Sequence, residues 1–227
     1  VYELSSGPTG SSSPGEDIFQ SYYIYPYYSS RTCIQIYDVS DPSNPTKVLL
    51  GGITGHPISS RMVGSVVYLL TEHSVLSGED ISVPQVLSDH GTEDVSSTSI
   101  YYDPACPSVS SFVNVLALDV VDGSRTNLTA LAGSSSVCYM SVTSLYITMS
   151  RWEGASSGLL TTTQGSLTTT IYRISVDGTR MTLSAQGSVE GAPLNQFALD
   201  EKDGRLRMAT TSHGEETDNQ VHILDMT

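Results

Sequence analysis

The chain has 227 residues, a formal net charge of −14 and a pI near 4.4. Binding to nucleic acid or to an anionic membrane surface needs a basic patch, so this charge argues against both kinds of partner. Charged residues make up 15% of the chain and hydrophobic residues 38%. The remainder is mostly Ser, Thr and Gly, which is poor material for long helices and typical of secreted β proteins.

The first 30 residues form a Ser-, Gly- and Tyr-rich leader that ends in the aromatic run SYYIYPYYSS. Its tyrosines are candidates for a contact surface, because exposed rings stack on sugars or pack against a neighbouring subunit. An edge strand with alternate rings buried is the other interpretation. The tyrosines concerned are Tyr22, Tyr23, Tyr25, Tyr27 and Tyr28. The chain opens at Val1 and stops after a strand-like segment, and we expect it to be an interior fragment of a longer protein. No apolar run reaches the roughly 20 residues of a membrane span, so no membrane insertion is expected.

The rest of the chain repeats one pattern of short β-strands. A strand, a turn and a second strand occupy residues 34–52, and a hairpin turning at Gly64-Ser65 follows in SSRMVGSVVYLLTE. The same order returns in residues 113–150 and again in residues 169–211, where the last turn lies near Asp203-Gly204. Each unit therefore contains two hairpins, or four strands, closed by residues with the right turn chemistry.

The spacing of the units predicts the fold. Asp38, Asp119, Ser175 and Asp225 hold equivalent places, and they are separated by 81, 56 and 50 residues. A period near 50 with four strands per unit is typical of propeller blades. We therefore predict an all-β fold, a partial β-propeller of about three four-stranded antiparallel blades over residues 31–227. The extra length of the first interval lies in residues 72–111, a Ser-, Asp- and Pro-rich insertion that is expected to be a surface loop.

The repeat also predicts the place of each strand within a blade. If the SSRMVG-type strand is innermost, the chain holds two complete blades and half a blade at each end. The loops between second and third strands, residues 72–111, 151–167 and 212–219, would then decorate one face. The loops between third and fourth strands would leave the other face plain. Open sheet edges attract further strands, so other parts of the same protein or neighbouring subunits should complete the propeller.

Four strings carry a family resemblance that covers residues 31–225. SSRMVGSVVYLLTE, SFVNVLALDV, CYMSVTSLYIT and APLNQFALDEKDGRLRMATT resemble the secreted proteins with a C-terminal β-propeller domain distantly related to WD40 repeats. The LNQFALDE…GRLRMATT stretch is the most specific of them. The resemblance implies a propeller fold and an extracellular or cell-surface location, and it brings no catalytic motif.

Cysteines and a sequon add to the secretory interpretation. The three cysteines show no zinc-ligand spacing. Cys138 falls on an innermost strand and should be a buried thiol, whereas Cys33 and Cys106 should both lie near the decorated face. We therefore predict a Cys33–Cys106 disulfide, with a partner outside the chain as an alternative. Asn127 is the acceptor of an Asn-Leu-Thr sequon and thus a candidate glycosylation site.

Candidate chemistry is sparse. Residues 154–158 match G-x-S-x-G, but a nucleophile elbow needs a following helix, and LLTTTQGSLTTT does not form one. Two acidic loops on the decorated face could hold Ca²⁺ through carboxylate oxygens, although neither follows the calcium-loop pattern. Their candidate ligands are Asp89, Glu93, Asp94, His213, Glu215 and Glu216. His73 and His213, at the ends of second-type strands, could share a metal, although solvated loop histidines are the default. No other cofactor is expected.

These features predict a protein without enzymatic activity. The expected function is that of a structural or protein-interaction propeller in an extracellular or cell-surface assembly, with glycans as a further class of partner. A propeller attached to a hydrolase, or a carbohydrate- or metal-binding module, is the alternative.

Overall fold

The computed structural model describes residues 30–75, 83–104, 109–133, 137–153, 156–158, 161–163, 165–213 and 217–225. Strands account for nearly all of the regular structure, as expected for a chain rich in β-branched residues and turn formers. Among the described residues, no helix is long and apolar enough to cross a bilayer. The strands are β1 (Arg31–Asp38), β2 (Thr46–Thr54), β3 (His56–Val63), β4 (Val66–Ser74), β5 (Gln85–Ser88), β6 (Gly91–Asp94), β7 (Ile100–Tyr102), β8 (Ser111–Asp119), β9 (Arg125–Ala132), β10 (Val137–Met140), β11 (Ser144–Glu153), β12 (Ser156–Gly158), β13 (Thr161–Thr163), β14 (Ser166–Asp177), β15 (Arg180–Glu190), β16 (Leu199–Lys202), β17 (Arg205–His213) and β18 (Thr217–Asp225).

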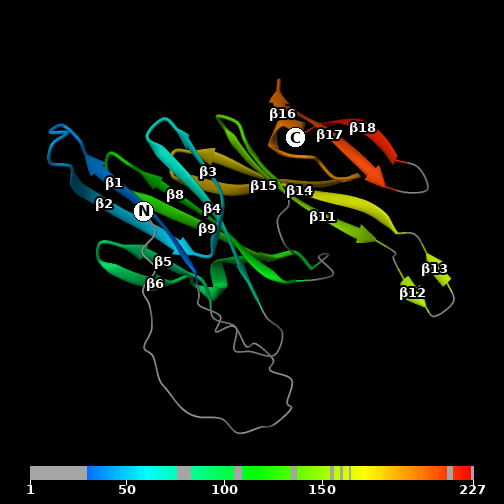
Figure 1. Ribbon diagram of the computed structural model, residues 1–227, viewed down its shortest axis with the longest axis horizontal. Coiled ribbons are helices and arrows are strands. Elements are labelled where there is room, and N and C mark those ends of the chain that lie inside the picture. The colour runs from blue at the N-terminus through cyan, green and yellow to red at the C-terminus, as the bar shows by residue number, and fades with distance from the viewer. Residues whose placement is uncertain are drawn as a thin grey trace, which may run out of the picture.

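Four sheets of three to five strands follow one another along the chain (Figure 1), and β12 and β13 form a separate two-stranded sheet. The first sheet has the order β1-β2-β5-β6, the second β3-β4-β8-β9-β7, the third β10-β11-β14-β15 and the fourth β16-β17-β18. The predicted phasing is confirmed, because SSRMVG lies in β3 at one edge of the second sheet, and β4, β8 and β9 follow it as second, third and fourth strands. The second and third sheets are the two complete blades. The first sheet contains a third and a fourth blade strand, β1 and β2, to which β5 and β6 are added. The fourth sheet contains a first, a second and a third blade strand, which are β16, β17 and β18.

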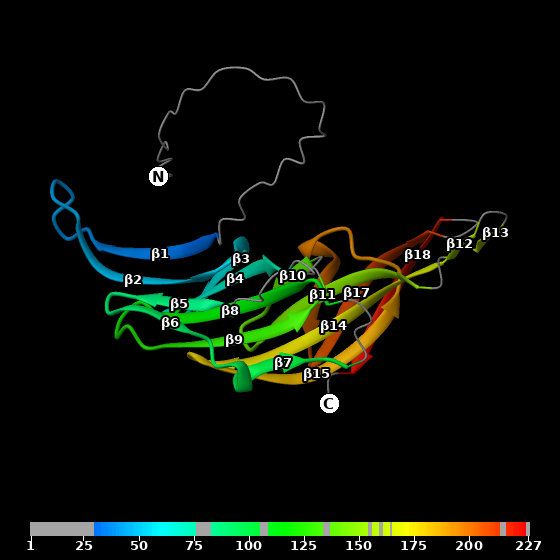
Figure 2. The same cartoon turned by 90° about the horizontal axis from the view of Figure 1, so that it is seen from below.

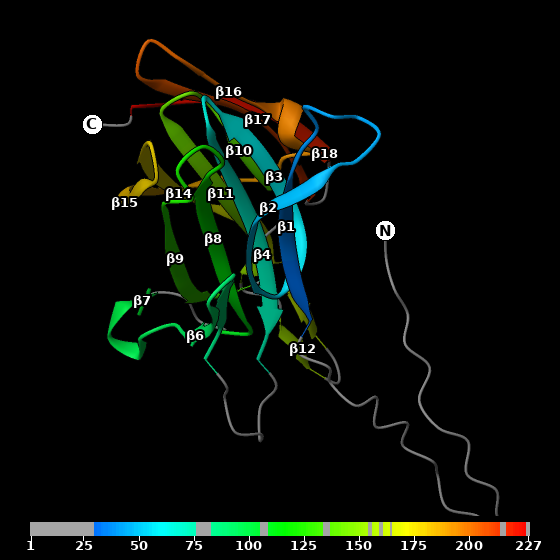
Figure 3. The ribbon, with the colours of Figure 1, turned by 90° about the vertical axis from the view of Figure 1, so that its left-hand side faces the viewer.

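The sheets pack face to face (Figures 2 and 3). A separate apolar cluster lies between each adjacent pair of sheets. Ile53, Leu69 and Leu116 fill the space between the first and second sheets. A larger cluster that includes Tyr68, Val115, Cys138, Leu145, Ile147 and Ile174 joins the second sheet to the third. Tyr146, Ile171, Val189, Leu199, Leu206 and Met208 join the third to the fourth. A sheet therefore buries apolar residues on both of its faces only when another sheet covers each face.

The turns follow the chemistry that the sequence indicates. Gly64 in the β3–β4 turn has φ +59°, and Asp203 and Gly204 in the β16–β17 turn have φ +53° and +74°. Left-handed backbone of this kind suits tight hairpin turns between antiparallel strands. The expected turns at Gly64-Ser65 and Asp203-Gly204 are thus confirmed.

The insertion differs from the expected surface loop, since its described part contains β-structure. β4 continues to Ser74 and β8 begins at Ser111, and between them the β5–β6 hairpin adds to the edge of β2 while β7 pairs in parallel with β9. Strands of three or four residues are too short to display a clear alternation of apolar and polar side chains. The open edges of β2 and β9, which are distant in sequence, supply the hydrogen bonds that order them.

The predicted contrast between loop faces holds only in part. Residues 75–110 and 154–165 separate second from third strands in the second and third sheets. In the fourth sheet only residues 214–216 separate β17 from β18, because both strands are longer than expected. The β1–β2 connection, residues 39–45, lies on the opposite face and is longer than the β17–β18 connection.

A glycine follows the outer strand wherever the chain passes to the next sheet. Gly55 follows β2 with φ +115°, and Gly191 follows β15 with φ +80°. Both lie against the backbone of the next sheet's second strand, where a Cβ would come within 2.7 Å of the Glu72 carbonyl oxygen and within 2.8 Å of the Thr211 carbonyl oxygen, respectively. Gly133 takes the same place after β9.

Buried polar groups stabilise the first crossing, the point where the chain passes from the first sheet to the second. The Thr54 carbonyl accepts hydrogen bonds from Thr71 Oγ1 at 2.8 Å and from Asn114 Nδ2 at 3.0 Å. Asn114 Oδ1 in turn accepts from Thr129 Oγ1 at 3.0 Å. Asn114, Thr71 and Thr129 are almost fully buried, so this network satisfies polar groups that have no access to water. At the third crossing Thr210 Oγ1 donates to the Glu190 carbonyl at 2.8 Å in the same manner.

Candidate functional site

The outer face of the fourth sheet carries the most unusual surface in the described part of the chain. In β8, Val115 and Ala117 face the third sheet and are 0% exposed. The repeat places Val221 and Ile223 of β18 in the equivalent positions, and these side chains are 74% and 63% exposed. The same sequence position is therefore buried where a following sheet is present and uncovered on the fourth sheet.

The other sheets obey the same rule. Ile34 of β1 packs against the cluster between the first and second sheets. Ile171 of β14, 2% exposed, belongs to the cluster between the third and fourth. Both are equivalent to Val115 and Val221, because each of the four lies four residues before one of the equivalent positions Asp38, Asp119, Ser175 and Asp225. The exposed apolar pair on β18 is thus the inter-sheet contact of this repeat without its partner.

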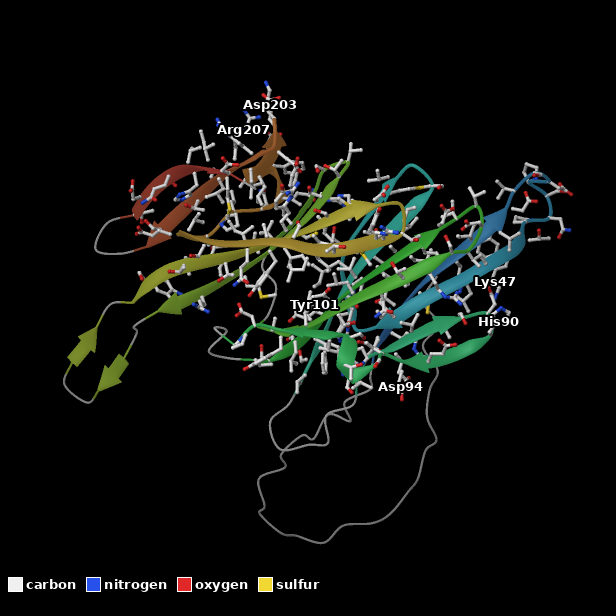
Figure 4. All side chains as sticks on the ribbon, turned by 180° about the vertical axis from the view of Figure 1, so that it is seen from behind. Lys47, His90, Asp94, Tyr101, Asp203 and Arg207 are labelled. Carbon is white, nitrogen blue, oxygen red and sulfur yellow. The ribbon has the colours of Figure 1, made fainter. Side chains whose placement is uncertain are left out.

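Further apolar side chains extend this uncovered surface, which we call the β18 flank. Leu194 and Phe197, in the segment before β16, are 87% and 86% exposed. Both line a groove of about 390 Å³ whose walls also include Ala209 and Val221. Arg207 of the neighbouring strand β17 is the register partner of Ile223, and Figure 4 shows it in the fourth sheet near Asp203. The β18 flank comprises Leu194, Phe197, Ala209, Val221 and Ile223. Sequence reasoning identified the open edge but not these residues. Aligning β8 with β18 would have found Val221 and Ile223, whereas no repeat signal marks Leu194, Phe197 or Ala209.

The edge of the fourth sheet is open as well. β18 pairs with β17 along its whole length, and it is the last strand of the described sheet. An unpaired strand edge presents a row of N–H and C=O groups that can hydrogen-bond to another strand. The β18 flank and the edge therefore offer both the apolar and the hydrogen-bonding parts of a blade contact.

The contact between the third and fourth sheets illustrates what a covered flank contains. Tyr139 and Tyr146 stack with ring centroids 5.9 Å apart, and burial raises the pKa of Tyr146 to about 12. Glu201 of β16 accepts a hydrogen bond from Ser141 Oγ at 2.6 Å and lies 3.9 Å from the Arg173 guanidinium. Apolar, aromatic and paired charged groups thus share one interface.

The structure does not bring the two acidic segments together. Asp89 lies in the β5–β6 turn, where its Oδ2 accepts from the Leu50 amide at 3.1 Å, whereas Asp94 pairs with Gln85 at the other end of the hairpin (Figure 4). Glu93 is exposed on the same hairpin. This hairpin belongs to the first sheet, so Asp89 lies beside the middle of β2 rather than on the decorated face.

The other acidic segment belongs to the fourth sheet. His213 ends β17, while Glu215 and Glu216 lie outside the described residues. His73 of β4 lies in the second sheet and His213 in the fourth, with the third sheet between them, so the structure does not bring these two histidines together. Burial and nearby His56 lower the pKa of His73. Within the described ranges no group of three or more His, Cys, Asp or Glu side chains could hold a metal ion, and the calcium hypothesis stays a prediction.

Two of the three cysteines, Cys33 and Cys138, lie among the described residues. Cys138 lies in the innermost strand β10 and is buried, which confirms the predicted buried thiol. Burial raises the pKa of Cys138 to about 11, against a smaller opposite effect of the Arg61 charge. Cys33 is exposed in β1 and forms no disulfide with another described residue. Cys106 lies outside the described residues, so its pairing with Cys33 stays a prediction.

These environments predict different thiol reactivities. In a Cys106→Ser variant at pH 8, a disulfide reagent such as 5,5′-dithiobis(2-nitrobenzoate) should label Cys33 rapidly and Cys138 only after unfolding. With a pKa near 11, about one Cys138 in a thousand is a thiolate at pH 8, and thiolate is the reactive form. Peptide mapping identifies the labelled residue. Equal labelling rates of the two cysteines in the folded protein would contradict the burial of Cys138.

The remaining predicted sites are placed as follows. Asn127 is exposed in β9, so a glycan would have room there, and glycosylation stays a prediction. The tyrosines at 22, 23, 25, 27 and 28 lie outside the described residues. Residues 156–158 of the G-x-S-x-G match form β12, which pairs with β13 in a hairpin rather than leading into a helix (Figure 1).

Antiparallel four-stranded sheets that follow one another face to face, with the first strand of each at the inner edge, define a β-propeller architecture. The described sheets are a partial propeller, since the fourth has no covering neighbour. A family model described as Beta propeller domain matches residues 7–227, and the chain belongs to that family. Searches of curated proteins and of solved structures found no match.

Proposed function

We propose that this chain is a structural or protein-interaction propeller of an extracellular or cell-surface assembly, and that its β18 flank binds another blade-type β-sheet. The covering sheet belongs to further sequence of the same protein or to a neighbouring subunit. The observation that carries the proposal is the exposure of Val221 and Ile223, whose equivalents Val115 and Ala117 are fully buried by the next sheet. Exposed Asn127 in its sequon supports the extracellular location.

A sheet is the occupant that fits best, because the flank combines alternating apolar side chains with an open strand edge. The β18 edge would hydrogen-bond to a fourth strand, and the flank would bury apolar area at roughly 25 cal/mol per Å². A small ligand or a solvated surface would leave the edge unpaired. Each of the three covered contacts between the described sheets also contains a cluster of buried apolar side chains.

Replacing Val221 and Ile223 by lysine tests the proposal. The isolated chain should self-associate through its flank, so its mass by light scattering should rise from 24.3 kDa to at least twice that value with concentration. The Val221→Lys/Ile223→Lys variant should stay monomeric, because lysine on an edge strand blocks pairing. The matched control is Val121→Lys/Val142→Lys, which adds the same charges at exposed turn valines. The control should associate like the unmodified chain.

Two outcomes would overturn this interaction function. One is an unmodified chain that remains monomeric at every concentration. The other is loss of association in the control variant to the same extent as in the flank variant, since charge rather than the flank would then be responsible. Circular dichroism of each variant verifies that the fold is retained.

A further inference from the structure

A cavity of about 220 Å³ lies between the outer strands of the second and third sheets, and it shares no described lining residue with the groove of the β18 flank. Blades of a propeller radiate from a central axis, so the space between them widens outward. The inner part of this space is filled by the cluster that contains Val115 and Leu145. Farther out, β9 contributes the small residues Ala130 and Ala132, and these leave the space open.

The walls of this cavity are largely apolar. Val113 and Leu128 line it from the second sheet. Ile147, Met149 and Leu183 line it from the third sheet. An apolar space of this kind holds water poorly, because a buried water molecule needs two to four polar partners. The walls therefore favour an apolar occupant.

The insertion adds aromatic rings at the margin of the cavity. β7 becomes a fifth strand of the second sheet by pairing with β9, and this places Tyr101 (Figure 4) and Tyr102 at the cavity. The two side chains are 43% and 58% exposed, so they form a rim in contact with solvent. Aromatic rings make favourable offset or edge-to-face contacts with other rings, and the thioether of Met149 also favours aromatic neighbours. The margin therefore suits an aromatic ring.

Polar groups at one end of the cavity hydrogen-bond to one another. Asp103 follows β7, and its Oδ2 accepts hydrogen bonds from the Tyr172 hydroxyl at 3.0 Å and from Gln186 Nε2 at 2.8 Å. Both donors belong to the third sheet, so these bonds join the segment after β7 to the opposite wall. A charged ligand would lose its hydration on entering the apolar walls, which costs far more than the transfer of a neutral ring. The cavity therefore favours a neutral ligand.

We propose that this cavity binds a small neutral aromatic molecule with a single ring, an activity that goes beyond the interaction function of the β18 flank. An apolar cavity of roughly 150 Å³ holds a benzene molecule, whereas drug-sized ligands need about 300 Å³ or more. A volume of about 220 Å³ therefore suits one ring with one or two small substituents. The ring packs between the aliphatic walls and contacts the tyrosine rim at its outer edge.

Fluorine NMR with residues 1–227 and three probes tests this assignment. The probes are neutral 4-fluorotoluene, cationic 4-fluorobenzylamine and anionic 4-fluorobenzoate, which share one ring and differ in a single substituent. 4-Fluorotoluene should bind at millimolar concentration or below. Each charged probe should bind at least tenfold more weakly, because its charge must be desolvated.

Variants of the cavity locate the binding. Ala130→Leu fills the cavity and should weaken binding of 4-fluorotoluene at least tenfold. Asn127→Leu, which adds a leucine at an exposed position of the same strand, should change it less than twofold. Leu183→Ala enlarges the cavity and should raise the affinity for 1-fluoronaphthalene at least threefold relative to that for 4-fluorotoluene. The flank variant Val221→Lys/Ile223→Lys should bind 4-fluorotoluene like the unmodified chain, so this assignment and the proposed function can fail separately.

Three results would overturn the assignment. The first is no binding of 4-fluorotoluene at millimolar concentration. The second is binding of either charged probe within tenfold of 4-fluorotoluene. The third is full binding by a folded Ala130→Leu variant, as judged by circular dichroism and the thermal midpoint, or an equal loss in Asn127→Leu. Leu183→Ala keeps the assignment testable if Ala130→Leu does not fold, because an unchanged ratio of the two affinities would contradict it as well.

Discussion

Replacing Gly55 or Gly191 by alanine will strongly destabilise the protein. Positive φ alone costs an alanine about 1 kcal/mol. At these two positions the new Cβ would also lie 2.7–2.8 Å from a carbonyl oxygen of the next sheet's second strand. Backbone cannot move aside as a flexible side chain does, so the total should exceed about 3 kcal/mol in free energy of unfolding.

The matched control is Gly178→Ala in the β14–β15 turn. Gly178 has φ +57°, and a Cβ there would meet no heavy atom within 4 Å. Gly178→Ala should lower the free energy of unfolding only by the cost of an alanine at positive φ, about 1 kcal/mol. In a thermal melt of a chain this size the midpoint should fall by about 2–4 °C for the control and by roughly 8 °C or more for the crossing glycines. Equal shifts would mean that the sheets adjust freely at the crossings.

Replacing Asn114 by alanine will lower the free energy of unfolding by about 2–4 kcal/mol. Asn114 is 0% exposed, and it bonds both to Thr54 at the end of β2 and to Thr129 of β9. Its removal leaves the buried Thr129 hydroxyl without this acceptor and opens a cavity in place of the amide. Urea unfolding, compared at the midpoint and slope, measures the effect.

The control for this variant is Asn219→Ala. Asn219 also accepts a hydrogen bond from a threonine, Thr211 Oγ1 at 2.8 Å, but it is exposed on β18. Water replaces the lost partner there, so its cost should stay within about 0.5 kcal/mol. An Asn114→Ala variant as stable as Asn219→Ala would show that the buried network does not hold the first two sheets together.

Part of the candidate interaction surface was within reach of sequence reasoning, whereas the contacts made by the insertion were not. The open end of the fourth sheet follows from strand phasing, and the register of the repeat makes Val221 equivalent to Val115. Asp103 and Tyr101 stand in no motif, and they lie in an insertion outside the repeat. The hydrogen bond from the Tyr172 hydroxyl to Asp103 depends on the pairing of β7 with β9, two strands that are distant in sequence.

By itself, the sequence determined the strand order within each blade, the hairpin turns and the all-β class. These depend on alternation along single strands and on turn residues, which are interactions between near neighbours. Only the tertiary structure decided that the insertion strands add to β2 and β9, that the two acidic segments lie in different sheets, and that Asn114 joins three strands. Such features depend on contacts between segments far apart in the chain, where a short strand or a lone polar residue leaves no periodic signal.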